Sequence, residues 1–525
     1  MVRTADLPSL EAVTDGSLLV SDRSGTGTFR ADALKAYATA GLATAASVTA
    51  ETLARTTSVT ALSAKAYGAV GDGIADDTAE LQAALDAATA ASLPLFIPAG
   101  RYLISAALNV RRGVRIFGAG AEPQAQQFTV PMQTGGNGTW FVLDGTHLVS
   151  VFNIAPAGVV SQQNEAFGVE ISQLGVYHTQ PAPAPGWAPY NYPAAILLGG
   201  ASDIRIRDIT LLNPTIGIRT TAEGGRVTIE RVRGQPLFQG MVFDNATDVV
   251  RVTDCHFWCF WSLDADVLSY QKGNAVAFQL GRIDNPIFAG NFAIWYRIFV
   301  QCTATASGVV NKAAFVGCGA DSCAFMLVIN DAIGGHSLLF TNCYGQGDPP
   351  ASNNAGVLIA GVGGTNVVTF VNCLLAKYGQ QLVAISATGT GNRVQLLGSN
   401  MTGWDNVPSG DCALSASAGN IILADSACVF FSTNNPAGIT SGAGFSTREP
   451  VIARGGCIVV SGTTSITANH SFGFSPTAIM LTPRGTLGAA KCYWWTATAT
   501  QYTVHVDVDP AVDVTFDVLL IAEAF

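Results

Sequence analysis

Four carboxylate side chains in the middle of this 525-residue sequence are candidates for proton transfer. Asp264, Asp266 and Asp284 lie in a long stretch that interrupts a sequence repeat, and Glu230 is predicted on the outward face of a strand. Glycoside cleavage usually needs two carboxyl groups that flank the bond, about 5–9.5 Å apart. If the chain cleaves a glycan, we therefore predict that its acid/base residues are among these four.

Two arginines near these carboxylates could bind an acidic sugar. Arg231 follows Glu230, and Arg282 lies two residues before Asp284, so either could neutralise a uronate or a sulfate. An eliminating enzyme would instead need a base such as Lys or Tyr, with an Arg or a metal ion on the uronate. No feature of the sequence decides between hydrolysis and elimination.

Aromatic residues are concentrated in two stretches that break the repeat, 176–193 and 256–297. Aromatic faces suit the C–H surfaces of sugars and offer a large contact area. A subunit interface or the core of a loop would collect the same residue types, so both interpretations stay open. The predicted substrate-binding residues are Trp187, Trp258, Trp261, Tyr270, Trp295, Tyr296 and Arg282.

The composition excludes several classes of protein. Charged residues make up only 12% of the chain and the net charge is −10, which disfavours a nucleic-acid partner. No apolar run is long enough to span a bilayer, and the N-terminus lacks the apolar region of a secretory signal. The eleven cysteines form no CxxC pair and the six histidines have no metal-ligand spacing. We predict no cofactor, no membrane insertion, and synthesis in a reducing cytoplasm.

The stretch AYGAVGDGIADDTAELQAALDAA, residues 66–88, predicts a turn followed by a capped helix. Glycines 71 and 73 around an aspartate are typical of a turn, and Asp77 with Glu80 is typical of an N-cap with a capping box. Its aspartates lack the spacing of a calcium loop. One apolar stripe at helical spacing follows, made of Leu81, Ala84, Leu85 and Ala88.

With the segments LPLFIPAGRYLI and GVRIFGAG that follow, this stretch resembles the N-terminal segment of the pectate-lyase-like right-handed β-helix superfamily. It is similar in particular to the version found in bacteriophage tailspikes. The resemblance covers about residues 64–120 and carries no catalytic motif. It implies that the helix covers the N-terminal end of a β-helix, as the terminal unit of a repeat array requires.

Internal repetition supports a β-helix independently. The segments DIRIRDI, RVTIERV and DVVRVTDC recur every 22 to 23 residues. FVQC, FVGC, FTNC and FVNC follow at residues 299, 315, 340 and 370, and NRVQLLGSN and NIILADSAC continue the series at spacings near 25 to 30. Aligned, they predict inward columns such as Ile206, Ile229, Val252, Phe315, Phe340 and Phe370. A column of turn residues follows: Asp208, Arg231, Asp254, Gln301, Gly317, Asn342, Asn372 and Gly398. After it comes a predicted stack of thiols: Cys255, Cys302, Cys318, Cys343 and Cys373.

The flanks differ from the repeat and define three predicted domains. Residues 1–63 have a short β segment and an Ala/Thr/Ser-rich stretch that reads as a helical neck, which resembles the virion-attachment end of phage tail proteins. Residues 64–447 form the capped parallel β-helix with inserted loops. Residues 448–525 alternate strongly and predict an antiparallel β-sandwich that serves as tip or trimerisation domain. The fold class is therefore all-β.

The resemblance implies a phage tailspike: a homotrimer in the virion tail, joined to the tail or baseplate by its N-terminus, made in the host cytoplasm. It also implies a bacterial surface polysaccharide as the partner, with depolymerase activity as a hydrolase or a lyase. A non-enzymatic receptor-binding or structural tail fibre protein on the same scaffold remains an alternative. A bacterial pectate-lyase-like enzyme is a third interpretation, disfavoured by the missing signal peptide and the anchor-like N-terminus.

Overall fold

Two parts of the chain form separate units, residues 1–61 and residues 62–525. The computed structural model describes residues 9–12, 18–22, 25–29, 61–122, 137–155, 166–347, 355–362, 364–376, 383–402, 412–417, 419–424, 428–430, 445–447, 451–470, 475–476 and 478–522. In the first unit, β1 (Ser9–Ala12), β2 (Leu18–Asp22) and β3 (Gly25–Phe29) form a small antiparallel sheet. The predicted helical neck, residues 30–60, lies outside the described residues.

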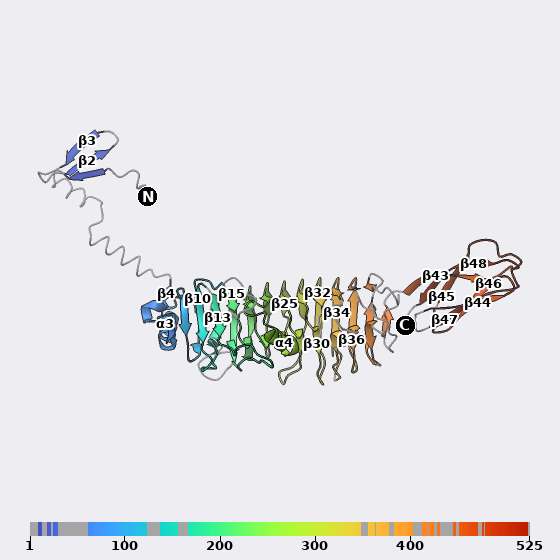
Figure 1. The fold of residues 1–525 in the computed structure, drawn as a ribbon, viewed down its shortest axis with the longest axis horizontal. Helices are drawn as coiled ribbons and strands as arrows, with labels where there is room; N and C mark the ends of the chain where they lie inside the picture. Colours follow the sequence, from blue (N-terminus) through green and yellow to red (C-terminus); the bar gives the residue numbers. More distant parts are fainter. Residues whose placement is uncertain are drawn as a thin grey trace. The chain divides into compact units, whose positions relative to one another are not determined.

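Most of the second unit is a parallel β-helix, which confirms the predicted fold (Figure 1). One sheet of 11 described strands closes one side of each coil. Its strands are β8 (Leu108–Val110), β11 (Phe152–Ile154), β14 (Ala194–Gly199), β16 (Ile216–Ala222), β19 (Gln239–Phe243), β22 (Val276–Leu280), β26 (Ile298–Cys302), β30 (Phe325–Ile329), β33 (Ala355–Ile359), β36 (Val383–Ala387) and β39 (Cys412–Ala416).

A larger sheet of 26 described strands forms the other sides, and it bends in the middle of each coil. Before the bend lie β4 (Leu62–Ser63), β6 (Leu95–Phe96), β9 (Arg115–Phe117), β17 (Gly225–Glu230), β20 (Val250–Thr253), β24 (Ile287–Ala289), β28 (Ala313–Val316), β31 (Ser337–Thr341), β34 (Val367–Val371), β37 (Arg393–Leu397), β40 (Ile421–Ala424) and β42 (Phe445–Thr447).

After the bend lie β5 (Asp72–Asp76), β7 (Gly100–Leu103), β10 (Thr139–Leu143), β18 (Arg233–Gly234), β21 (His256–Phe257), β25 (Phe292–Ile294), β29 (Gly319–Asp321), β32 (Tyr344–Gln346), β35 (Leu374–Ala376), β38 (Asn400–Thr402) and β41 (Val429–Phe430). Two long strands, β13 (Glu170–His178) and β15 (Ala201–Leu211), run through the bend, and β12 (Ala166–Phe167) pairs with β15. A short third sheet pairs β23 (Ile283–Asp284) with β27 (Val310–Asn311).

Left-handed backbone forms the bend on successive coils. Asp208, Arg231, Asp254, Asn342 and Asn372 all have φ between 49° and 55°, and Gly317 and Gly398 also have positive φ. Asn, Asp and Gly are the residues that tolerate this conformation best, which explains the predicted turn column. One residue of the predicted turn column was wrong. Gln301 lies in β26 of the smaller sheet, and the coil between Asp254 and Gly317 bends at Gly290 instead.

The thiol stack needs the same correction. Cys255, Cys318, Cys343 and Cys373 follow the bend and are buried, but Cys302 pairs with Leu280 and Ile329 in the smaller sheet. Asn291 takes its place in the stack, and its side-chain Oδ1 accepts a hydrogen bond from the backbone amide of Cys255 at 3.0 Å. The prediction failed because each coil has a third strand with the same short apolar pattern, and four letters such as FVQC do not tell the two sheets apart.

The inward columns form one continuous core. Phe288, Phe315, Phe340 and Phe370 stack face to face on consecutive coils, with ring centroids 4.6–5.0 Å apart and planes within 16° of parallel. Each ring is fully buried. Burial of a side chain of this size contributes about 1.5–3 kcal/mol, so repetition of the column stabilises the solenoid along its whole length.

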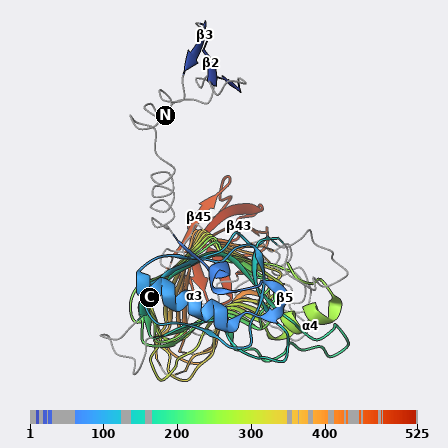
Figure 2. The same cartoon turned by 90° about the vertical axis from the view of Figure 1, so that its left-hand side faces the viewer.

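The helix α3 (Thr78–Ala91) lies across the N-terminal end of the coils (Figure 2). Its predicted apolar stripe is buried, which covers the end of the core. The capping box does not form: the carboxylate of Asp77 accepts hydrogen bonds from the backbone amides of Val70 and Gly71 instead of a helical amide. Asp77 thus ties the turn, which includes the short 3-10 helix η2 (Ala64–Tyr67), to the start of the helix.

Beyond the coils, two three-stranded antiparallel sheets share one hydrophobic cluster. They are β43 (Val451–Val459), β48 (Val514–Ala522) and β45 (Ala478–Pro483), and β44 (Ser465–Asn469), β47 (Gln501–Val506) and β46 (Tyr493–Ala497). Phe516, Val504 and Val459 are at its centre. Within the described residues, no helix is long and apolar enough to cross a membrane.

Candidate functional site

A groove of about 730 Å³ runs along the bend of the larger sheet. Four consecutive coils contribute a bend residue to it, namely Gln173, Asp208, Arg231 and Asp254. Since neighbouring strands are about 4.8 Å apart, these coils give the groove a length of roughly 14 Å. The remaining lining residues are Gly120, Ala121, Glu122, Thr210, Arg233, His256, Trp258 and Phe260.

The floor of the groove comes from the first outward position after each bend. Thr210, Arg233 and His256 pair in register on adjacent coils. Strand alternation places these side chains outside while their neighbours Leu211 and Phe257 fill the core. The solenoid therefore brings a hydroxyl, a guanidinium and an imidazole side by side, although each is 23 residues from the next in the sequence.

Aromatic rings form one wall. Trp258 and Phe260 leave the coil directly after β21, with ring centroids 5.4 Å apart and nearly perpendicular planes. The His256 ring packs edge-on between Phe260 and Phe292, at 5.4 and 5.3 Å. Such an arrangement offers flat apolar surfaces beside polar groups, which is the combination that sugar rings require.

The electrostatics of the groove are mixed. Arg233 donates to the hydroxyl of Thr210 at 3.2 Å and to the carbonyl of Ala121 at 3.1 Å, and no carboxylate pairs with it among the residues described. Burial, together with the nearby Arg233 charge, lowers the pKa of His256. Hydrogen bonds from Arg231 hold the pKa of Asp208 below its usual range. At neutral pH the groove therefore presents both cations and carboxylates beside a neutral imidazole.

Two Asp–Arg–Asp sets cross neighbouring coils, one at each end of the strands before the bend. At the start, Arg226 binds Asp203 with its Nε at 2.8 Å and Asp248 with its Nη1 at 3.0 Å. At the bend, Arg231 binds Asp208 twice, at 2.7 and 3.0 Å, and makes no bond to Asp254. We call the first the closed ladder and the second the open ladder. Only the open ladder lies in the groove.

The predicted carboxylates do not converge. Asp264 is the N-cap of α4 (Ala265–Asn274) and accepts the amide of Asp266 at 2.9 Å. Asp284 is in β23, where Arg282 binds it at 3.1 Å. Glu230 projects from β17, with Arg231 Nη1 3.8 Å away. These residues occupy three different positions around the coil, and none lines the groove.

The predicted aromatics are divided in the same way. Trp187 and Trp261 are buried against each other and against Tyr270, at 6.0 and 5.6 Å from Trp187. This cluster joins the loop 179–193 to the insertion that carries α4. Tyr296 is fully buried and donates to the Pro236 carbonyl at 2.7 Å. The Lys272 ammonium lies over the half-buried ring of Trp295. Of the predicted substrate-binding residues, Trp258 alone lines the groove.

The insertion is also shorter than predicted. The strands β22, β24 and β25 are regular parts of their coils, with Phe278 and Phe288 in the core, so the repeat is interrupted only between residues 258 and 275. The prediction extended the break to residue 297 because α4 lengthens this coil and shifts the next strands out of the 23-residue period. Sequence reasoning missed Arg233, His256 and Phe260, although their position two residues after the turn column was readable.

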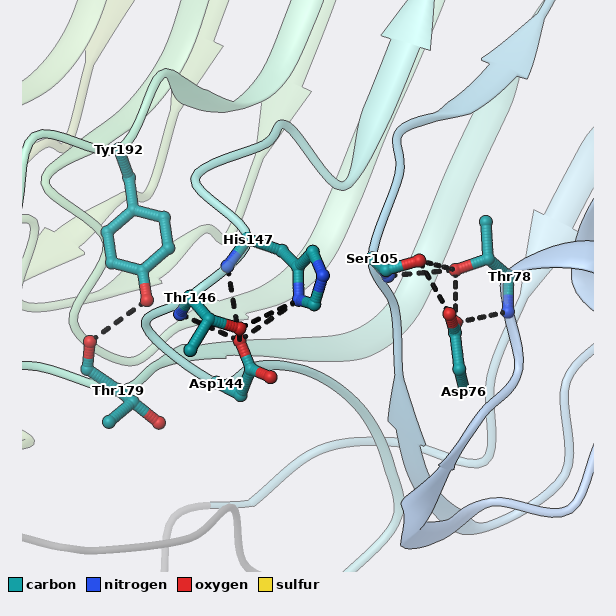
Figure 3. A network of polar contacts seen from close by, with 8 residues as sticks. All are labelled: Asp76, Thr78, Ser105, Asp144, Thr146, His147, Thr179 and Tyr192. Carbon is teal, nitrogen blue, oxygen red and sulfur yellow. Dashed lines mark hydrogen bonds and ion pairs between the residues drawn. The ribbon is translucent and has the colours of Figure 1, made fainter.

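Polar contacts elsewhere on the first coils connect neighbouring segments (Figure 3). Asp76 accepts from Ser105 at 2.5 Å and from the amide of Thr78 at 3.0 Å. Asp144 accepts from Thr146 at 2.7 Å and lies 3.3 Å from the ring of His147. These side chains hold loops in place. In the part of the chain that the structure describes, no group of three or more His, Cys, Asp or Glu side chains could hold a metal ion.

The stacked parallel strands define the class of this protein as a parallel β-helix. Residues 61–252 match the family model described as "Rhamnogalacturonase A/epimerase, pectate lyase-like", which confirms this part of the resemblance.

Among curated proteins, the mannuronan C5-epimerase AlgE4 of Azotobacter vinelandii is 47% identical over 64 residues, 11% of this chain and 12% of the relative. The epimerase AlgE2 of the same organism is 45% identical over 64 residues, 6% of its length. The chain thus covers a small fraction of these relatives.

The solved structures to which the chain is similar include two tailspikes. The Dettilon tailspike protein gp208 has a TM-score of 0.47 and 12% identity over 88% of this chain and 94% of its own. The tailspike gp49 of Pseudomonas phage LKA1 has a TM-score of 0.46 and 13% identity, over 88% of this chain and the whole of its own. The Agl-KA catalytic domain has a TM-score of 0.49 and 13% identity, over 74% and 69%.

Proposed function

We propose that this chain is a phage tailspike that binds a bacterial surface polysaccharide in the groove along the bend and cleaves it during host adsorption. The observation that carries the proposal is the groove itself. It spans four coils and combines the rings of Trp258 and Phe260 with the cation Arg233 and the carboxylate of Asp254. A polymer of sugars lying along the solenoid could contact all of them at once.

Two further features support the proposal. The family model that matches residues 61–252 is named for enzymes that act on polysaccharides. The floor of the groove, Thr210, Arg233 and His256, also lies on paired strands, which suits a site that must hold a stiff ligand. The three-part order of attachment segment, β-helix and tip domain, with boundaries near residues 63 and 447, completes the tailspike proposal.

The proposal includes a homotrimer attached to the virion through residues 1–63. On the C-terminal coils several outward side chains of the larger sheet are apolar, and Val316 and Leu339 are 41% and 40% exposed. Such a surface suits burial against two further copies of the chain.

A binding and cleavage assay tests the function. Purified protein is incubated with surface polysaccharides of candidate hosts, and the release of reducing ends or of unsaturated sugars is followed. The appearance of unsaturated sugars would identify elimination, and reducing ends alone would identify hydrolysis. Binding without products would favour the non-enzymatic receptor-binding alternative, and neither binding nor products from any host would refute the proposal.

Two tryptophan variants test whether the glycan binds in the groove. Trp258→Ala should weaken glycan binding by roughly tenfold, equivalent to about 1.4 kcal/mol. Trp494→Ala is the matched control, because Trp494 is 47% exposed in β46 of the C-terminal sheets. Single amide substitutions of Asp264, Asp266, Asp284 and Glu230 test the four residues predicted from the sequence in the same assay. Equal losses for the two tryptophan variants would place the site elsewhere.

A further inference from the structure

The closed and open ladders differ in the pairing of their second aspartate, and the fold does not account for this difference. In the closed ladder, both carboxylates bind Arg226. In the open ladder, Asp208 takes both bonds from Arg231, and the carboxylate of Asp254 makes no hydrogen bond or ion pair within the described residues. The left-handed bend accounts for an Asp or Asn at position 254, but not for a carboxylate that remains unpaired.

On the other side of Asp254, Gly290 offers no side chain as a partner. It is the next bend residue along the solenoid, and a Cβ at this position would lie 2.6 Å from Asp254 Oδ1. Asp254 Oδ1 thus packs against the Gly290 backbone, and Gly290 itself supplies no donor side chain to the carboxylate. Asp254 instead faces the groove beside Trp258 and His256, where a bound glycan would be its neighbour.

We propose that Asp254 is the general acid that protonates the departing oxygen of the glycan, with Asp208 as the general base. The inference rests on the proposed function of the groove. The two aspartates are separated by one coil, so their backbones are about 9.5 Å apart. Carboxyl groups about 6.5–9.5 Å apart are typical of glycosidases that invert the anomeric centre, because a water molecule must fit between one of them and the sugar.

The proposed reaction is a hydrolysis of the glycosidic bond. Water attacks the anomeric carbon, and Asp208 takes the proton that this water releases. The bond from the anomeric carbon to the bridging oxygen breaks, its electron pair stays on that oxygen, and the oxygen takes the proton of Asp254. Arg231 keeps Asp208 ionised through its two hydrogen bonds, so that Asp208 can accept a proton, whereas Arg231 makes no hydrogen bond to Asp254.

The test compares matching substitutions in the two ladders. Asp254→Asn should lower kcat by about 10² or more while the glycan Kd stays within threefold of the original. Asp248→Asn, which removes the corresponding carboxylate of the closed ladder, should leave kcat within about twofold. NMR of the first product should show inversion of the anomeric configuration. The alkaline fall of kcat with pH, which reports deprotonation of the acid, should disappear in Asp254→Asn.

Three results would overturn the inference while leaving the groove as the site: full cleavage by Asp254→Asn, equal loss in both variants, or retention of configuration. Cleavage that yields unsaturated sugars, or glycan binding by the unaltered protein without cleavage, would also overturn it. If Asp254→Asn does not fold, Asp254→Gly is used instead, since glycine accepts the left-handed backbone of the bend. Failure of the unaltered protein to bind or cleave any glycan would be a failure of the proposed function itself.

Discussion

The outward face of the larger sheet changes character halfway along the solenoid, although the inward face does not. One outward column reads Arg115, Glu170, Arg205, Thr228 and Arg251 on the N-terminal coils, and then Ile287, Ala314, Leu339 and Thr369. The corresponding inward residues are apolar throughout. The repeat therefore specifies the fold, whereas function depends on the outward positions that the fold leaves unconstrained.

The two halves suit different partners. Charged side chains cover the N-terminal face and form salt bridges between coils, such as Arg207 to Glu170 at 2.8 Å. This face is therefore hydrated and can make directional hydrogen bonds to a ligand. The C-terminal face has few charges to solvate, and its Val316 and Leu339 remain exposed in one chain. We therefore expect the first half to bind the glycan and the second half to bind other copies of the chain.

The largest effect should come from charge on the C-terminal face. Leu339→Arg and Val316→Arg together should abolish the homotrimer, because two buried cations per chain would have no partner in an apolar interface. Light scattering measures the outcome. Thr228→Arg adds the same side chain in the same outward column on the N-terminal coils and should leave the trimer intact. A trimer that survives the double substitution would remove the distinction between the two halves.

The second effect concerns the inward face. Phe340→Ala should destabilise the β-helix by about 3–5 kcal/mol, because it opens a cavity between the rings of Phe315 and Phe370. Leu339→Ala, at the adjacent outward position, should cost less than about 1 kcal/mol within a single chain. Denaturant unfolding of both variants measures the difference, and similar losses would contradict the assignment of the two faces.

These inward positions were predictable from the sequence. Period-2 alternation and a turn residue every 22 to 30 residues identified Ile229, Phe315 and Phe340 correctly, because packing and backbone strain act at each coil separately. Gln301 and Cys302 were misplaced because the third strand of a coil has a similar pattern and no turn residue to distinguish it.

The groove could not be predicted in the same way. Arg233 and His256 are neighbours only because their coils stack, and outward positions follow no hydrophobic period. Asp254 was visible in the sequence, but the turn column explained it completely. Its missing partner is a property of three coils together, which only the structure shows.

The third effect is a loss of stability in acid, caused by a histidine in the N-terminal half. His178 is fully buried, its ring nitrogens have no hydrogen-bond partner among the described residues, and burial lowers its pKa to about 3. Since its unfolded pKa is about 6.5, protonation favours the unfolded chain, and stability should fall between pH 6.5 and about 3. At pH 4.5, two units below the unfolded pKa, the loss is roughly 3 kcal/mol for one proton.

His178→Phe should remove this loss and raise the Tm at pH 4.5 relative to the Tm at pH 7. His147→Gln is the control, since the ring of His147 is 48% exposed. An unchanged difference between the two Tm values in His178→Phe would show that other groups cause the acid sensitivity.

The smallest predicted effect distinguishes glycan binding in the groove from glycan binding elsewhere on the charged N-terminal face. Arg233→Met should weaken glycan binding by about tenfold, equivalent to about 1.4 kcal/mol, because it removes donors that no carboxylate occupies. Arg205→Met removes an exposed guanidinium from the same sheet outside the groove and should change the Kd by less than twofold.

Arg233→Lys keeps the charge without the planar fork, so a partial recovery would show that the charge contributes directly. Because Arg233 also binds Ala121 and Thr210, the Tm of each variant must be measured. A weaker Kd at an unchanged Tm identifies a glycan contact, whereas equal effects at Arg233 and Arg205 would mean that the whole N-terminal face, and not the groove, binds the ligand.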